Sequence, residues 1–315
     1  MVPAPTSLRG RDLMRIADLT AAEIETVLAH AERLKAHRHG GPSRTLLDGR
    51  VLGMLFEQPS TRTRASFEVA MTQLGGTALN LAAGDLQLSR GEPIRDTAIV
   101  LSRYVDAIVM RTASHERVEE LAASADAPVI NGLTPLHHPC QALADLLTVK
   151  EHLGRLDGVR IAFLGDGNSN VCHSLLEACA LVGVDLVVAS PPGYEPALDV
   201  HRRASQPAAA SGARIEIASG PREAAADADV LYTDVWTSMG SEHERGQRAA
   251  DLAPYGLDER LLRLASDRAV VMHCLPAHVG EEITEGLLYG DRSAVWDQAE
   301  NRLHAQKALL ALVVA

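Results

Sequence analysis

The chain has 315 residues, 46% of them hydrophobic and 23% charged, and a formal net charge of -11. This length exceeds what one hydrophobic core usually fills, which predicts two domains, and no apolar run reaches the length of a membrane span. The negative charge argues against a nucleic-acid ligand. Four cysteines without a C-x-x-C pair indicate neither a zinc knuckle nor a disulfide framework, and the first ten residues lack the apolar core of a secretory signal, so we expect a cytoplasmic protein.

Regularly spaced apolar residues predict a first helix and then a series of strands. Thr20 and Glu23 form the T-x-x-E pattern of a capping box, and helical spacing continues to Arg38 before two glycines end it. Short apolar runs then alternate with amphipathic segments, and we interpret these runs as strands at residues 51–56, 107–110, 161–164, 186–189, 230–232 and 270–272. Such alternation predicts an α/β fold with parallel sheets covered by helices on both faces, in which ligands bind beyond the carboxyl ends of the strands.

A domain boundary is predicted near the middle of the chain. Residues 139–154 have the pattern of one helix, and a new strand starts soon afterwards at Arg160. We therefore expect a first domain at residues 1–150 and a second at 151–299, each a parallel sheet with helices on both faces, joined by interdomain helices. The last helical pattern, at about 300–315, has an apolar tail and is expected to pack back on the first domain.

The first strand leads into a segment with the chemistry of a phosphate site. It continues as E-Q-P-S-T-R-T-R, and residues 65–74 are helical, so a helix begins on Ser60 or Thr61. Backbone N–H groups at a helix start are unpaired and carry partial positive charge, so together with the hydroxyls and Arg62 they form a phosphate cradle without a glycine-rich loop. Taken alone, the segment fits ordinary helix capping beside a solvated arginine slightly better.

Two further segments of the first domain place polar side chains at a strand end or a helix start. Arg111 directly follows the strand at 107–110. In L-H-H-P-C-Q, His138 precedes a proline and is held extended, so His138 and Gln141 can both point toward a ligand at that helix start, whereas His137 is expected to face elsewhere. A zinc site built on the two histidines lacks further ligands at suitable spacing.

The second domain opens with a segment superficially similar to a dinucleotide-binding turn. The strand at 161–164 runs into G-D-G-N-S-N-V, but Asn170 stands where the third glycine belongs, and no acidic residue ends the next strand. Asn168 and Asn170 suit hydrogen bonding instead. A nucleotide-binding or regulatory module remains a rival from another functional class, which predicts stabilisation by nucleotides.

Two later strand ends carry further candidate residues, and two stretches are loose. The strand at 230–232 ends in D-V-W-T-S-M-G, which offers Asp234 at a strand end, where a carboxylate more often faces a cleft. In M-H-C-L-P-A-H, Cys274 suggests a nucleophile, but neighbours on a strand point to opposite faces, so His273 is not placed to act as its base. The loose stretches are residues 191–196 and the polar run 238–251.

These motifs together resemble the ornithine carbamoyltransferase family from the first helix to the last. S-T-R-T, H-P-C-Q, D-V-W-T-S-M-G, H-C-L-P and E-N-R stand in the order and at the spacings of that family. The resemblance implies transfer of the carbamoyl group from carbamoyl phosphate to the δ-amine of ornithine, which gives citrulline and phosphate in arginine metabolism. It further implies a cytoplasmic homotrimer of arginine biosynthesis with active sites at the subunit interfaces, and we expect no metal and no organic cofactor.

The resemblance also implies a role for each matching residue. The phosphate would be held by Ser60, Thr61, Arg62, Thr63 and Arg111. The carbamoyl oxygen would be polarised by Arg111, His138 and Thr63, and the carbamoyl nitrogen would be bound by Gln141. Arg302 would reach in from the other domain, and the adjacent subunit would lend Gln87.

On the ornithine side, the family implies contacts to each of the substrate's three polar groups. The α-amino group would be bound by Asp234 and Ser238, and the carboxylate by Asn170 and the backbone near Met239. The δ-amine would be lined by Cys274 and Leu275.

Some features separate this chain from its nearest alternatives. Carbamoyltransferases that accept putrescine, acetylornithine or aspartate are the closest rivals, and Asp234 disfavours the first two because it suits a free α-amino group. Aspartate enzymes have a different strand end where H-C-L-P stands. One departure from the ornithine family is Val279, where many relatives have arginine.

Overall fold

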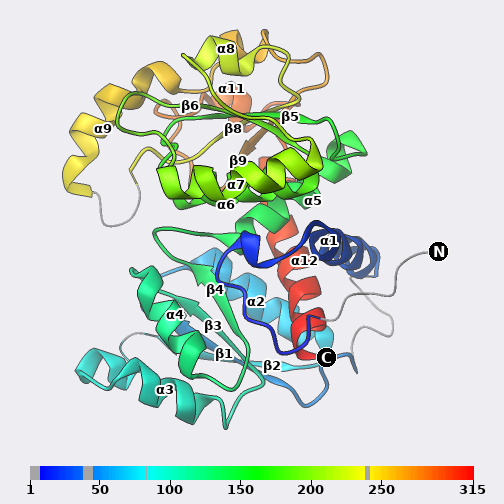
Figure 1. The fold of residues 1–315 in the computed structure, drawn as a ribbon, viewed down its shortest axis with the longest axis vertical. Helices are drawn as coiled ribbons and strands as arrows, with labels where there is room; N and C mark the ends of the chain where they lie inside the picture. The colour runs from blue at the N-terminus through cyan, green and yellow to red at the C-terminus, as the bar shows by residue number, and fades with distance from the viewer. Residues whose placement is uncertain (1–7, 38–44, 83, 85, 238–241) are drawn as a thin grey trace. The chain divides into compact units, whose positions relative to one another are not determined.

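The computed structural model describes residues 8–37, 45–82, 84, 86–237 and 242–315. It divides into two compact units, drawn as ribbons in Figure 1. The first unit comprises Met1–Leu147 and Asn301–Ala315, and the second comprises Thr148–Glu300. The chain passes between the units within two helices, α5 (Pro139–Leu153) and α12 (Val295–Val314). No helix in the described ranges combines the length and the apolar composition that a membrane crossing requires.

The first unit contains a four-stranded parallel sheet in the order β2-β1-β3-β4. Its strands are β1 (Val51–Phe56), β2 (Thr77–Ala82), β3 (Ala107–Arg111) and β4 (Val129–Leu133). Its other helices are α1 (Ala21–Ala36), α2 (Thr61–Leu74), α3 (Ile94–Leu101) and α4 (His115–Ser124). The two central strands, β1 and β3, are buried on both faces, which explains why they read as continuous apolar runs in the sequence.

Local signals fix the ends of the helices in the first unit. Thr20 caps α1 by accepting a hydrogen bond from the backbone N of Glu23 at 3.3 Å, and the Glu23 carboxylate accepts one from the Thr20 backbone N at 2.8 Å, which confirms the predicted capping box. The predicted end at Arg38 lies outside the described residues. Helix α2 ends at Gly75, whose φ of 89° is costly for any residue with a side chain.

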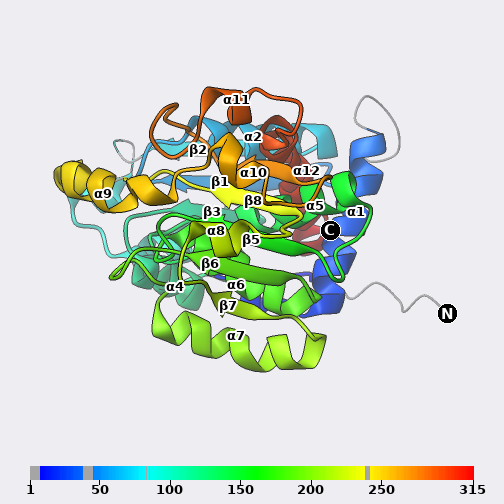
Figure 2. The ribbon, with the colours of Figure 1, turned by 90° about the horizontal axis from the view of Figure 1, so that it is seen from above.

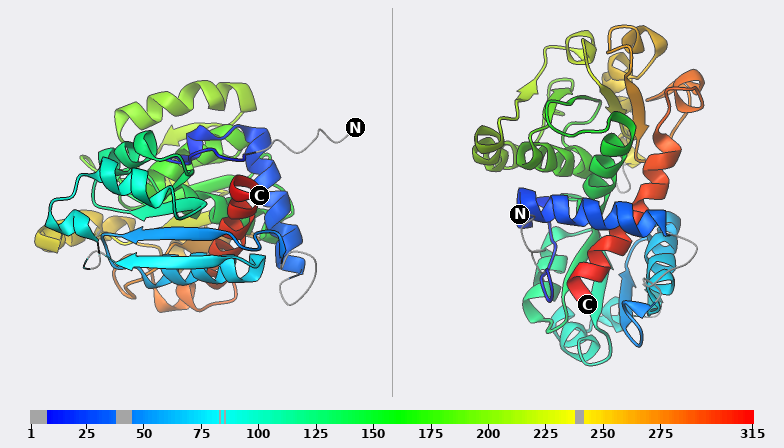
Figure 3. Two further views of the ribbon diagram at one scale, coloured as in Figure 1. Left: turned by 90° about the horizontal axis from the view of Figure 1, so that it is seen from below. Right: turned by 90° about the vertical axis from the view of Figure 1, so that its right-hand side faces the viewer.

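The second half of α12 belongs to the first unit. The Lys307 ammonium donates to the backbone O of Leu34 at 3.1 Å and to the Gln73 side chain at 2.9 Å, so α12 contacts both α1 and α2. The right-hand view of Figure 3 shows α12, in red, passing beside α1, in blue. This packing buries a cationic side chain against a helix C-terminus, where backbone carbonyls favour positive charge.

The second unit contains a five-stranded parallel sheet in the order β7-β6-β5-β8-β9, which Figure 2 shows from above. Its strands are β5 (Arg160–Leu164), β6 (Asp185–Ala189), β7 (Ile215–Ile217), β8 (Val230–Thr233) and β9 (Val270–His273). Helices α6 (Asn170–Val182) and α7 (Leu198–Ser211) lie on one face, and α8 (Pro221–Ala225) and α11 (Glu285–Leu288) on the other. The short helices α9 (Arg245–Leu252) and α10 (Glu259–Leu262) complete the unit. Two parallel sheets with helices confirm the predicted α/β class.

Three strands were not predicted from the sequence, and each has a physical reason. Strand β2 lies at a sheet edge and is only partly buried, so its sequence T-A-L-N-L-A has no apolar run. Strand β4, V-I-N-G-L, is interrupted by the polar Asn131, whose side-chain nitrogen donates to the Met14 backbone O at 2.8 Å in the interior. Strand β7 has three residues, too few for a periodic pattern.

Candidate active site

The segment S-T-R-T forms the start of helix α2 at the carboxyl end of strand β1. Ser60 is the N-cap, with its hydroxyl accepting a hydrogen bond from the backbone N of Thr63 at 3.3 Å, so the helix begins at Thr61 as predicted. Arg62 is exposed in this first turn, whereas Thr63 is fully buried. Unpaired N–H groups, hydroxyls and a guanidinium thus meet at one helix end, the arrangement that binds a phosphate.

Arg111 ends the neighbouring strand and adds a buried positive charge. It pairs in register with Phe56 of β1, so it leaves the sheet beside the segment that leads into α2. Only 6% of Arg111 is exposed. Burial, and then the positive charges of Arg302 and Arg62, lower the pKa of Arg111 to about 10. The mutual repulsion shows that three guanidiniums face one region, which a multiply charged anion would neutralise.

Arg302, on helix α12, is also buried, and it contacts the phosphate segment directly. Its guanidinium donates to the Thr63 hydroxyl at 2.6 Å. The resemblance implied that Arg302 would reach in from the other domain, but the residue lies in the first unit, because the division of α12 falls before Asn301. The first unit therefore contains all three arginines that the sequence assigned to the anion.

His138 lies in the same region as a neutral imidazole. It is 3% exposed, and its pKa lies well below 6.5, first because of burial and then because of the charges of Arg302, Arg111 and Arg62. At neutral pH the ring is therefore uncharged. A neutral imidazole donates a hydrogen bond without adding charge, which suits the polarisation of a carbonyl oxygen.

Gln141 presents an amide acceptor in the first turn of α5. Its side-chain N donates to Asp145 at 2.8 Å, one helical turn further on, and its Oε1 is buried without a hydrogen-bond partner among the described residues. An N–H donor on a ligand would satisfy this oxygen.

His137, the residue before His138, packs its ring against His115, with centroids 5.2 Å apart, which agrees with the expectation that it faces elsewhere.

Glu57, which the sequence reading did not select, holds two loops of this region together. Its carboxylate accepts a hydrogen bond from the Thr112 hydroxyl and two from the Arg117 guanidinium, one of them at 3.2 Å. Its backbone N donates to the Arg111 carbonyl at 3.0 Å. The loop after β1 is therefore fixed to the loop after β3, and a bidentate pair gives this contact a defined geometry. The signal in the sequence was an acidic residue directly before a phosphate-type helix start.

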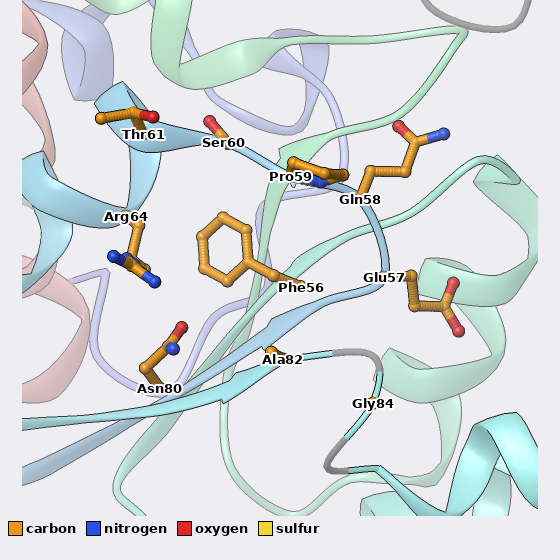
Figure 4. Close-up of a pocket in the computed structure, with 10 residues that line it drawn as sticks. All are labelled: Phe56, Glu57, Gln58, Pro59, Ser60, Thr61, Arg64, Asn80, Ala82 and Gly84. Carbon is orange, nitrogen blue, oxygen red and sulfur yellow. The ribbon is translucent and has the colours of Figure 1, made fainter.

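A pocket of about 410 Å³ adjoins the helix start (Figure 4). Ser60 and Thr61 line it together with Arg64 and Asn80, and Figure 4 shows the Phe56 ring between these two side chains and Glu57. None of Arg111, His138 and Arg302 lines this pocket. Gln87, at the start of a short 3-10 helix, is exposed, and its amide O accepts from Arg90 at 3.4 Å.

In the second unit, Asp234 and Cys274 come together from the ends of adjacent strands. Asp234 follows β8 and is buried, and its Oδ1 accepts hydrogen bonds from the Cys274 thiol and from the backbone N of Val235, both at 2.7 Å. Burial raises the pKa of Asp234, although the nearby His273 ring and these hydrogen bonds oppose the shift. A ligand ammonium would favour the ionised carboxylate, so the site suits an amine.

His273 is engaged by neighbours other than the thiol. Its Nδ1 accepts from the backbone N of Leu275 at 2.8 Å, and its Nε2 lies 3.2 Å from the buried Glu282 carboxylate. A ring nitrogen lies within 4.8 Å of the Cys274 sulfur, yet both nitrogens are committed elsewhere, which agrees with the argument against His273 as base for Cys274. Leu275 has a φ of 58°, a rare conformation for leucine that the His273 contact stabilises.

The remaining residues expected to bind the amino acid are only partly described. Asn170 is the first residue of α6, and Ser169 caps that helix by accepting from the Cys172 backbone N at 3.2 Å. Ser238 and Met239 lie outside the described residues, so their predicted roles stay predictions.

Val279, the position at which this chain departs from many relatives, is 49% exposed.

Comparison with known proteins matches both halves of the chain. Residues 11–151 match the carbamoyl-P binding domain of aspartate/ornithine carbamoyltransferase, and residues 157–313 match its Asp/Orn binding domain. An ornithine carbamoyltransferase of Anoxybacillus flavithermus is 55% identical over 307 residues, 98% of each chain. An anabolic ornithine carbamoyltransferase of Pyrococcus furiosus is 54% identical over 308 residues, again 98% of each chain.

The solved structures agree with the sequence relatives. The structure of ornithine carbamoyltransferase from Pyrococcus furiosus superposes with a TM-score of 0.94 at 53% identity and covers 98% of both chains. One from Giardia lamblia superposes with a TM-score of 0.88 at 32% identity, covering 96% of this chain and 97% of that one. The chain belongs to the aspartate/ornithine carbamoyltransferase family of transferases.

Proposed function

We propose that the protein transfers the carbamoyl group of carbamoyl phosphate to the δ-amine of L-ornithine and releases citrulline and phosphate. The observation that carries this proposal is the buried set of Arg111, Arg302 and His138 beside the start of α2, where Arg302 donates to Thr63 at 2.6 Å and nearby positive charges lower the pKa of Arg111 and of His138. The relatives that are more than half identical over nearly the whole chain are named for this reaction.

Carbamoyl phosphate is proposed to bind in the first unit. Its phosphate accepts hydrogen bonds from the helix start and is neutralised by the arginines, through Ser60, Thr61, Arg62, Thr63 and Arg111. His138, Arg111 and Thr63 polarise the carbamoyl oxygen, Gln141 accepts from the carbamoyl N–H, and Arg302 adds charge while it holds Thr63. Fixed donors aimed at oxygens where charge develops supply most of the acceleration in such sites.

Ornithine is proposed to bind in the second unit. Asp234 and Ser238 hold the α-amino group, Asn170 and the backbone near Met239 hold the carboxylate, and Cys274 with the Leu275 carbonyl lines the δ-amine. The raised pKa of Asp234 supports this assignment, because an ammonium partner would relieve the cost of burying the carboxylate.

The reaction forms a C–N bond and breaks a C–O bond. The δ-amine nitrogen attacks the carbamoyl carbon, the bond from that carbon to the bridging phosphate oxygen breaks, and the proton that the amine loses is taken up by the departing phosphate. An amine of this kind has a pKa of ~10.4, so its deprotonation at pH 7 costs about 4.6 kcal/mol at roughly 1.36 kcal/mol per unit. No group of the chain needs to act as a strong general base if the amine enters in its neutral form.

A substrate assay tests the proposed function most directly. Purified protein is given carbamoyl phosphate with ornithine, putrescine, N-acetylornithine or aspartate, and the carbamoylated product is measured. Citrulline should form fastest, because only ornithine among these offers a free δ-amine together with the α-amino group that Asp234 suits. A preference for any of the other three acceptors would overturn the proposal.

The active unit is proposed to be a homotrimer in which the adjacent subunit lends Gln87. Exposed apolar side chains in the first unit support an interface there, among them Leu79 of edge strand β2 and Ile99, Val100 and Tyr104 around the end of α3. The exposed position of Gln87 is compatible with its donation to a neighbour. Exposed apolar groups of this size commonly mark contact surfaces.

Subunit complementation tests the shared site. Gln87→Ala and Arg62→Ala proteins, each inactive alone, are dissociated, mixed in equal amounts and reassembled. In a closed ring of three, every mixed trimer regains one intact site, so about a quarter of wild-type activity should return. A mixture as inactive as its components, although mixed trimers are detected by mass, would exclude sharing between subunits.

A cytoplasmic role in arginine biosynthesis is proposed with the reaction. The four cysteines are free, which suits a reducing compartment, and the Pyrococcus furiosus relative is named anabolic. Expression of the gene in a strain that lacks its own ornithine carbamoyltransferase should restore growth without arginine.

A further inference from the structure

Arg248, on helix α9, lies within the polar stretch that had no recognisable motif, yet its side chain is only 13% exposed. Its guanidinium forms an ion pair with the Asp166 carboxylate and donates through Nε to the Trp236 backbone O at 2.6 Å. The guanidinium carbon also lies 5.0 Å from the centroid of the Tyr194 ring. A charged side chain with three such partners is part of the folded structure rather than a solvated surface group, and we call Arg248 with Asp166, Trp236 and Tyr194 the Arg248 junction.

The Asp166 side of this junction leads to the proposed carboxylate-binding residue. Asp166 follows strand β5, and its other carboxylate oxygen accepts from the backbone N of Asn168 at 3.0 Å. The Asp166 carbonyl accepts from the backbone N of Ser169 at 3.2 Å, and Ser169 in turn caps α6, whose first residue is Asn170. Asp166 therefore shapes the turn that presents Asn170, and Arg248 fixes Asp166.

The Trp236 side leads to the proposed amino-group-binding residue. Trp236 follows Asp234 by two positions, and its buried indole packs at Gly165, where an added Cβ would lie 3.8 Å from the indole nitrogen. Arg248 holds the carbonyl of this residue, so the segment after β8 has its path fixed on one side by the indole and on the other by the guanidinium.

The third contact joins the two loose stretches of the sequence. Tyr194 lies in the stretch 191–196, and its hydroxyl donates to Asp251 at 3.0 Å, while Asp251 also accepts from the Gln247 side chain at 2.8 Å. Tyr194 therefore joins the loop after β6 to helix α9 by two contacts. Its ring lies under the Arg248 guanidinium, and its hydroxyl donates to Asp251. The orientation of Arg248 is set before any ligand arrives.

We infer that Arg248 is a positioning residue that sets the spacing between Asn170 and Asp234, and hence the fit of the carboxylate and α-amino groups of the amino-acid substrate. The inference rests on the proposed function. A planar, charged guanidinium can bind a carboxylate and a carbonyl at once in fixed directions; lysine has the charge without the planar set of donors, and glutamine lacks the charge. The interaction acts through these two residues, and Arg248 itself makes no contact with substrate.

The test compares Arg248→Gln with Arg245→Gln by steady-state kinetics and by inhibition with L-norvaline, which is ornithine without its δ-amine. Arg245 lies on the same helix, is 59% exposed at its side chain and pairs with Glu281 at 2.7 Å, so it is the matched control. In Arg248→Gln, the KM for ornithine and the inhibition constant of norvaline should rise together by about tenfold or more, since a displaced ligand contact costs that much. The KM for carbamoyl phosphate should stay within about threefold, and Arg245→Gln should behave as wild type.

Two further variants keep the test decisive if Arg248→Gln folds poorly. Arg248→Lys keeps the charge but loses the planar set of donors, and Asp166→Asn keeps the oxygen that faces Asn168 but loses the charge. Both variants should raise the KM for ornithine and the inhibition constant of norvaline. The double variant of Arg248 and Asp166 should be no worse than the poorer single variant, because the two residues act as one unit. Unchanged norvaline inhibition in all of them, or an equal rise in the KM for carbamoyl phosphate, would overturn the inference. An inactive wild type would instead refute the proposed function.

Discussion

The two units hold their candidate residues in opposite electrostatic states. In the first unit, burial and nearby positive charges lower the pKa of Arg111 and that of His138, which is neutral. In the second unit, burial raises the pKa of the Asp234 carboxyl. Each set of charges is therefore unfavourable without a ligand and is relieved by a ligand of the other sign, a phosphate in one case and an ammonium in the other. These opposite shifts support the proposed binding of the phosphate in the first unit and of the amine in the second.

The largest expected effect tests the cationic side of this comparison. Arg62→Ala removes one of three guanidiniums and should lower turnover by about 10³-fold, since the charge acts on the departing phosphate. Because Arg62 is exposed, thermal unfolding should be nearly unchanged. Arg103→Ala, an exposed arginine of the same unit, is the control. Turnover within a few-fold of wild type would remove Arg62 from the mechanism.

A somewhat smaller effect is expected on the anionic side, with an opposite consequence for stability. Asp234→Asn keeps acceptors for Cys274 and Val235 but removes the charge, so kcat/KM for ornithine should fall by about 10²-fold. The folded protein has the higher pKa for Asp234, so the ionised form costs stability at any pH above that raised value. The variant should therefore melt at a higher temperature than wild type at pH 7.

The pH dependence of that stability difference provides the check. Below the ordinary value of 3.8 the carboxyl is protonated in both the folded and the unfolded chain, so the advantage of Asp234→Asn should shrink as pH falls toward 4. A variant that melts below wild type at pH 7 would show that the Asp234 charge stabilises the fold, contrary to the comparison.

A smaller change, per pH unit, is expected in the activity profile, which separates the ionisation of the substrate from that of the chain. With the δ-amine entering as a free base, kcat/KM for ornithine should rise by about tenfold per pH unit above neutrality until it levels near the pKa of the amine. His138 should add no step near pH 6.5, because it is already neutral there. A flat profile from neutral to mildly alkaline pH would contradict this account, and a step near 6.5 that disappears in His138→Asn would contradict the neutral imidazole.

The sequence predicted the residues that lie at ends of regular elements. Strand ends and helix starts have local signals, so Ser60, Arg111 and Gln141 were selectable from apolar runs, a pre-proline position and capping residues alone. The same signals gave the fold class, since buried parallel strands are continuous apolar runs.

What the sequence did not predict depends on contacts between distant positions. Glu57 pairs with Arg117 across 60 positions, and Arg248 with Asp166 across 82, and neither pair has a local pattern. The edge strand β2 was missed because one of its sides is partly solvated. Long-range ion pairs of this kind appear only once the sheet order brings their loops together.

The first unit is discontinuous, and this has a consequence for how the protein is made. Arg302 follows the whole second unit in the chain, so a nascent polypeptide that already carries every other arginine of the anion site still lacks the donor to Thr63. During translation the first unit can acquire its finished form only after the second has been synthesised. A product cut short before α12 would lack Arg302 and the Lys307 contacts to α1 and α2.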